Sequence, residues 1–183
     1  MAKIKLNALV ESAQGRLGND LVLKRTRSGA TILAKKPTFP KNRKFSTAQR
    51  DHQRRFKRAV VYAKVAQTNP IYATLAKKLK QPAYNVALAD AMHTPRVIEI
   101  DVSGYHGKAG DVIRVQAEDD VQVTRVLLTI YATHEQVIEE GKAVGDRAGG
   151  WWTYTTQTTK NGASVKAVAY DLAENESSLT TML

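Results

Sequence analysis

After Pro95 the sequence consists of short segments in which apolar and polar residues alternate, and this pattern constrains the fold more than any other feature. A period of two is typical of strands that bury one face. Seven such strands with turns about every eight to twelve residues, and without a helical period, indicate an all-β sandwich of two sheets. The expected strands cover residues 97–102, 111–117, 121–131, 137–141, 151–156, 163–170 and 177–181.

The sequence before Pro95 shows a helical period instead. A first, long helix should turn a stripe that includes Phe56 and Ala63 toward the core, because these residues fall on one face at 100° per residue. Asn69-Pro70 is a typical helix start, with Asn as the N-cap and Pro at the first helical position. The expected helices cover residues 46–67, 70–79 and 82–92.

The amino-terminal residues are expected to form a basic β-hairpin and an arm. Strands at residues 21–26 and 30–35 flank a short turn in which Gly29 can adopt a positive φ. Residues 36–44 follow with two prolines and several cations, which favours an extended segment. The predicted fold class is therefore α+β in two modules, a hairpin-and-helix module at residues 1–94 and a β-sandwich at residues 95–183.

The charge of the chain is divided between these two modules. Residues 1–94 carry 20 Lys and Arg against 4 Asp and Glu, a net charge of +16, whereas residues 95–183 carry 8 against 13, a net charge of −5. A basic module favours an anionic partner, and a solvated surface that only keeps the protein soluble is the alternative. The candidate contact residues are cations of the hairpin, the arm and one face of the long helix: Lys24, Arg25, Arg27, Lys35, Lys36, Lys41, Arg43, Lys44, Arg50, Arg54, Lys57 and Arg58.

Two adjacent tryptophans suggest a second contact surface. Trp151 and Trp152 must point to opposite faces of their strand, so one belongs to the core. We expect the other at an interaction surface, and cover by a neighbouring element is the alternative. Glu139-Glu140 is expected to form a solvated strand edge.

The residue types that carry catalysis or bind metals give no support for an enzyme. The chain has no cysteine, its four histidines lack ligand spacing, and phosphate-binding loops and nucleophile motifs do not occur. We therefore expect no catalytic residue, no metal, no cofactor and no small-molecule substrate.

One acidic group leaves an alternative open. Its members can meet at one end of the sandwich as oxygen ligands for calcium, although such residues more often cap turns, which is the favoured interpretation. They are Glu118, Asp119, Asp120, Asp171 and Asn175.

Three segments of the carboxy-terminal module resemble the immunoglobulin-like repeats of bacterial surface and phage proteins. They are Ala117-Glu118-Asp119-Asp120-Val121, Gly150-Trp151-Trp152-Thr153-Tyr154 and the run from Val168 to Ser177, in which Glu174 stands where the family usually has glycine. The resemblance implies an immunoglobulin-like sandwich that presents a surface or acts as a spacer. In the amino-terminal half, Gly15-x-x-Gly18-Asn19, Lys36-Pro37, Gln49-Arg50 and Arg54-Arg55-Phe56 resemble small uncharacterised proteins of phages and prophages.

Together these features predict a non-enzymatic structural or interaction protein, an accessory component of a phage or prophage virion. Its basic half would dock on an anionic assembly surface of other structural proteins or of further copies, and its sandwich would be displayed. Nucleic-acid binding through phosphate contacts is the alternative. The sequence contains no run of eighteen apolar residues, so we expect no membrane span. The first residues lack the apolar region of a signal peptide, so we expect synthesis in the cytoplasm, with the virion as a destination.

Overall fold

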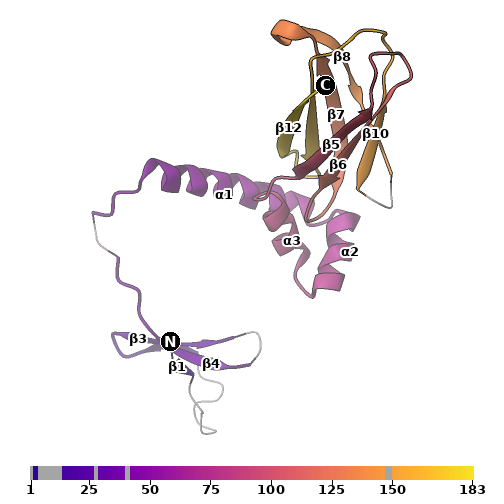
Figure 1. Cartoon of the computed structure of the whole chain (residues 1–183). Coiled ribbons are helices and arrows are strands. Elements are labelled where there is room, and N and C mark those ends of the chain that lie inside the picture. Colours follow the sequence, from indigo (N-terminus) through magenta and orange to yellow (C-terminus); the bar gives the residue numbers. More distant parts are fainter. Residues whose placement is uncertain (1, 4–13, 27–28, 40–41, 147–149) are drawn as a thin grey trace. The chain divides into compact units, whose positions relative to one another are not determined.

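The computed structural model of the chain describes residues 2–3, 14–26, 29–39, 42–146 and 150–183. Two compact units make up the chain, Met1–Ser46 and Thr47–Leu183. The helices thus group with the strands that follow them (Figure 1). This boundary differs from the predicted module boundary between residues 94 and 95, which coincides instead with the change from helix to strand.

The first unit is an antiparallel sheet with a small core. Its strands have the order β1-β4-β3-β2. The β3–β4 pair, which the sequence predicts, closes through a turn in which the Gly29 amide donates to the Thr26 carbonyl, and Gly29 adopts a φ of +83°. Among the described residues of this sheet, Leu23 and Thr31 are buried, at 7% and 4% exposure. The strands are β1 (Ala2–Lys3), β2 (Gly15–Leu17), β3 (Leu21–Arg25) and β4 (Thr31–Lys35).

The second unit begins with three helices, α1 (Thr47–Ala66), α2 (Pro70–Leu79) and α3 (Ala83–Asp90). As expected, the Asn69 side chain caps α2, accepting a hydrogen bond from the Ile71 amide. Among the described residues, no helix combines the length and the apolar character that a membrane span needs.

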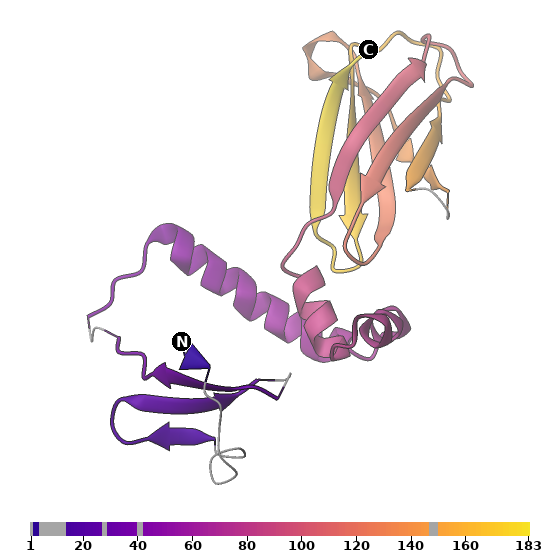
Figure 2. The ribbon, with the colours of Figure 1, turned by 60° about the horizontal axis from the view of Figure 1, so that its bottom comes forward.

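The helices pack around a small core of their own. Tyr72 and Ala87 are fully buried in it beside Ala63, and Val121 and Leu172 of the β-sheet region pack against the same cluster. Only the carboxy-terminal half of α1 contributes to this core, because α2 and α3 lie beside that half and do not reach the amino-terminal half (Figure 2). The expected position of Phe56 in the core is therefore wrong, since its side chain is 46% exposed.

Two four-stranded antiparallel sheets form the rest of the second unit. Their strand orders are β5-β6-β10-β9 and β12-β11-β7-β8. A 3₁₀ turn, η1 (Thr133–Glu135), precedes β8. The strands are β5 (Arg96–Gly104), β6 (Val112–Glu118), β7 (Val123–Tyr131), β8 (Val137–Lys142), β9 (Val144–Gly145), β10 (Trp151–Thr155), β11 (Ser164–Asp171) and β12 (Glu176–Met182).

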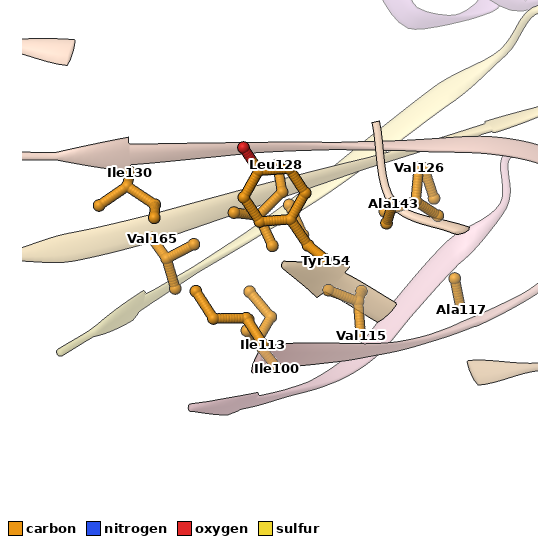
Figure 3. Packing of buried hydrophobic residues seen from close by; sticks show 12 residues of the cluster. Ile100, Ile113, Val115, Ala117, Val126, Leu128, Ile130, Ala143, Tyr154 and Val165 are labelled. Atoms are coloured by element: carbon orange, nitrogen blue, oxygen red, sulfur yellow. The ribbon is translucent and has the colours of Figure 1, made fainter. Parts of the chain in front are cut away.

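The two sheets face each other across one apolar core. Ile113 and Val115 of β6 point toward Val126 and Leu128 of β7, and all four side chains are fully buried (Figure 3). Alternate residues of β6 and β11 face this core, which is the pattern that the sequence predicts for stacked sheets.

One charged residue departs from the predicted pattern. Glu139 was expected at a solvated edge, but its side chain is buried and accepts hydrogen bonds from Tyr154, Gln157 and Thr158. These donors lie far along the chain, so the local sequence of β8 does not reveal them.

Candidate functional site

The amino-terminal half of α1 presents a cationic surface. Four cations expected to contact a partner are exposed here, and we call them the basic face: Arg50, Arg54, Lys57 and Arg58. Arg50, Arg54 and Lys57 border one shallow groove, because helical spacing places them on the same side. Asp51 offsets part of the charge through an exposed ion pair with Arg54. A surface of this kind suits an extended anionic partner better than a small ligand.

The remaining cations of the predicted contact set lie in the first unit. Those that the structure describes are all exposed, whereas Arg27 and Lys41 lie outside the described residues. Arg43 lies over the ring of Phe45, with 4.9 Å between its guanidinium carbon and the ring centroid. The exposed cations are Lys24, Arg25, Lys35, Lys36, Arg43 and Lys44.

The two tryptophans lie on opposite faces of β10. Trp152 is paired with the buried Val115 and packs against the core, while Trp151 is paired with Gln116 on the outer face. Trp151 is half-buried, so it offers only part of its indole to a partner.

Three carboxyl groups meet where the helices join the sheets, and we call them the aspartate cluster. Asp90 ends α3, Asp119 follows β6 and Asp171 ends β11. One oxygen from each lies within 4.8 Å of the others. Asp90 is 1% exposed and Asp171 is fully buried, whereas Asp119 is partly accessible. These oxygens are suited to a hard cation or to a shared proton.

Each aspartate of the cluster is oriented by hydrogen bonds. The Tyr72 hydroxyl donates to Oδ2 of Asp90. The amides of Val121 and Gln122 both donate to Oδ2 of Asp119 at 2.9 Å. Further support comes from Asn175, whose backbone amide donates to Oδ1 of Asp171 and whose Nδ2 donates to Oδ2 of the same residue, both at 2.7 Å.

The surroundings disfavour negative charge on this cluster. Burial, together with the nearby carboxylates of Asp171 and Asp119, raises the pKa of Asp90 to about 7, although the hydrogen bond from Tyr72 opposes the rise. Burial also raises the pKa of Asp171, against the hydrogen bonds from Asn175. The cluster therefore gains stability from any positive charge that enters it.

The sequence anticipated part of this arrangement. Asp119 and Asp171 do meet, and both also cap turns as the favoured interpretation expects. Glu118 is exposed, and Asp120 turns away to pair with His93, whose Nδ1 lies 2.7 Å from Asp120 Oδ2. Sequence reasoning missed Asp90, because nothing in the local sequence of α3 signals that its last residue approaches the sheets. The available signal was its position three and four residues after Ala87 and Val86, on the apolar face of the helix.

Comparisons with known proteins give little further guidance. The chain matches no family model and none of the curated proteins. Among solved structures, it is 16% identical to an engineered protein, covering 55% of this chain and 25% of that one with a TM-score of 0.36. It is 12% identical to a conjugative transposon lipoprotein from Bacteroides eggerthii, covering 48% of this chain and 92% of that one with a TM-score of 0.25. Likenesses at this level carry no conclusion about function.

Proposed function

We propose that this chain is a non-enzymatic interaction protein whose basic segments dock on an anionic macromolecular surface while its β-sheet region is displayed. The observation that carries the proposal is the exposure of α1 from Thr47 to Arg58, where Asp51 alone is partly covered. A helix that only supported the fold would be covered along one side for most of its length. Here about three turns of helix are exposed to solvent, where a partner can contact them.

The strand order of the second unit supports an immunoglobulin-like domain as the displayed part. Taken along the chain, β5, β6, β10 and β9 correspond to strands A, B, E and D of that fold. The other sheet, β12-β11-β7-β8, corresponds to strands G, F, C and C′. This correspondence agrees with the family resemblance carried by Asp119, Trp152 and the Val168–Ser177 run.

A phage or prophage virion is the setting that we propose for this role. The support is the resemblance of both halves of the sequence to proteins encoded by phages. An accessory virion protein needs one surface that holds it to the particle and one that faces outward, and the division of charge at Pro95 fits this need. The docking partner would then be an acidic surface of another structural protein or a further copy of this chain.

Nucleic-acid binding is the second candidate, and the basic face favours it. The spacing of Arg50, Arg54 and Lys57 brings their charges to one groove, where they can follow a line of phosphates. The exposed ring of Phe56 lies on the same helix and offers a surface for base stacking.

One capture experiment separates the two candidates. The tagged full-length chain is incubated with source lysate or particles, with and without nuclease, beside two variants of equal charge. One variant carries Gln at the four positions of the basic face. The matched control carries Gln at four other exposed cations of the same unit, Lys64, Lys77, Lys78 and Lys80.

The outcomes are distinct. The docking proposal expects a protein partner that survives nuclease, is lost with the basic-face variant and is retained by the control. Loss of all bound material on nuclease treatment would instead support nucleic-acid binding. Equal retention by both variants would show that the basic face is not the docking surface.

A further inference from the structure

We propose that the aspartate cluster is a binding site for a divalent cation, and that the cation is calcium. The proposal is independent of the docking function, because no residue of the cluster belongs to the basic face or to α1. Its ligands come from three separate segments, the last turn of α3, the β6–β7 turn and the end of β11.

The unpartnered oxygen of Asp90 is the first argument. Asp90 is 1% exposed, and although its Oδ2 accepts from Tyr72, its Oδ1 has no hydrogen-bond partner in the part of the chain that the structure describes. A buried carboxylate oxygen without a partner is costly. A carboxyl oxygen of Asp90 lies within 4.8 Å of oxygens from Asp119 and Asp171, so a cation in the cluster would lie beside this carboxyl group and compensate its burial.

The net charge of the cluster is the second argument. The described residues place no Lys or Arg in an ion pair with Asp90, Asp119 or Asp171, and the neighbouring His93 is already paired with Asp120. Two of the three carboxyl groups are buried, where uncompensated charge is unfavourable. A divalent ion would neutralise most of this charge at once.

The chemistry of the ligands selects the ion. All three ligands are hard carboxylate oxygens, which Ca²⁺ and Mg²⁺ prefer and which Zn²⁺ uses less often than nitrogen or sulfur. Mg²⁺ is usually held by one or two carboxylates and several waters, whereas Ca²⁺ accepts more carboxylate ligands in a flexible shell. Three carboxylates in one cluster therefore favour calcium.

An ion also has a route into the cluster. Asp119 is partly accessible and lines a surface depression of about 270 Å³ together with Thr94 and Glu118. Water molecules that enter from this side would complete the coordination shell, since three carboxylates leave calcium with open positions.

Bound calcium would join the helices to the sheets. The Nδ2 atom of Asn175 already donates to the carbonyl of Asp90 at 3.0 Å and to that of His93 at 2.8 Å, so the end of α3 is held against the β11–β12 turn. An ion held by Asp90 and Asp171 would reinforce the same junction. Calcium should therefore stabilise the second unit as a whole.

The test begins with the chelator-treated full-length protein. Terbium, a luminescent substitute for calcium, should show emission on excitation of tyrosine, because Tyr72 contacts Asp90 directly. Added Ca²⁺ should quench this emission by displacement. At a hundredfold excess of Ca²⁺ over its Kd, the melting temperature should rise by about 5–10 °C relative to EDTA.

Asn substitutions locate the site. Asp119→Asn is the main variant, because Asp119 is accessible and its replacement is the least disruptive to the fold. It should weaken calcium binding at least tenfold. Asp120→Asn is the matched control, since Asp120 is the adjacent residue but pairs with His93 outside the cluster. It should bind calcium as the unchanged chain does.

Three results would overturn the proposal. The first is an unchanged chain without calcium-dependent melting or terbium emission, which would mean that protons or the nearby Arg96 balance the charge. The second is calcium affinity retained in Asp119→Asn. The third is an equal loss of affinity in Asp120→Asn.

Discussion

The hydroxyl of Tyr62 donates a hydrogen bond of 3.0 Å to the carbonyl of Leu172, which joins α1 to a residue 110 positions further along the chain. The same hydroxyl lies 2.7 Å from that of Tyr72, whose ring packs edge-on against the ring of Tyr62. The Tyr62 proton is donated to Leu172 and the Tyr72 proton to Asp90, so the two hydroxyls meet in a close polar contact between these hydrogen bonds. Together the three contacts connect the end of β11 to Asp90. Residues 47–94 are held to the sheets by polar contacts as well as by apolar packing.

Replacement of Tyr62 by Phe should destabilise the second unit by about 1–2 kcal/mol, because it removes the hydrogen bond to Leu172 and leaves that carbonyl without its donor. Urea unfolding followed by circular dichroism measures this change. Tyr84→Phe on α3 is the control, since no hydrogen bond links its hydroxyl to the described residues, and it should change stability by less than about 0.5 kcal/mol. Equal effects of the two substitutions would argue against a stabilising role of the Tyr62 hydrogen bond.

Stability should fall as the pH drops below about 5, in part because of Glu139. Burial alone would raise the pKa of this carboxyl, but hydrogen bonds from Thr158, Tyr154 and Gln157 outweigh burial and hold the pKa below its usual value of 4.5. A carboxyl whose pKa is lower in the folded state stabilises the fold above the unfolded pKa. That contribution is lost as the pH falls through the folded pKa.

Glu139→Gln should therefore flatten the acid limb of a plot of melting temperature against pH. It should also lower stability at pH 7 by about 1–3 kcal/mol, because its amide group would face donors that need an acceptor. Glu140→Gln, on the exposed side of β8, should leave both the limb and the stability unchanged. This account would be contradicted if the melting temperature of the Glu139→Gln protein fell with decreasing pH as steeply as that of the unchanged chain.

Leu128→Ala should cost about 2–5 kcal/mol, because Leu128 is fully buried between the two sheets and its loss leaves a cavity. Val144→Ala offers a contrast, since Val144 on β9 is 76% exposed and its change should cost less than about 0.5 kcal/mol. Thermal unfolding of both variants tests whether the core lies where Figure 3 places it.

Salt provides a test of the basic face. If the four cations contact phosphates, a log–log plot of affinity for a DNA duplex against salt should have a slope near −3 to −4, at about −0.9 per contact. Fluorescence anisotropy measures this affinity at salt concentrations between about 50 and 200 mM. Affinity that does not change over this range would exclude phosphate contacts. The Gln variant of the basic face should then bind as the unchanged chain does.

The strands and helices were predictable because their signals are local. The alternation in residues 163–170 predicts β11 to within one residue, and Asn69-Pro70 predicts the start of α2. By contrast, the exposure of Phe56, the burial of Glu139 and the approach of Asp90 to Asp171 depend on contacts between distant segments. A single sequence carries no local sign of such contacts. The cluster was accordingly half predicted, from the two turn aspartates, and completed only by the fold.

The alternating burial of β11 has a consequence for the aspartate cluster. Val165, Ala167 and Ala169 face the core, and Asp171 is the next residue in that inward row. The pleat of β11 that turns these apolar side chains inward also turns the Asp171 carboxylate inward. A deletion of one residue within β11 would turn Asp171 outward and bring Leu172 into its place. The chain cannot shift this strand to repack its interior without also dismantling the cluster.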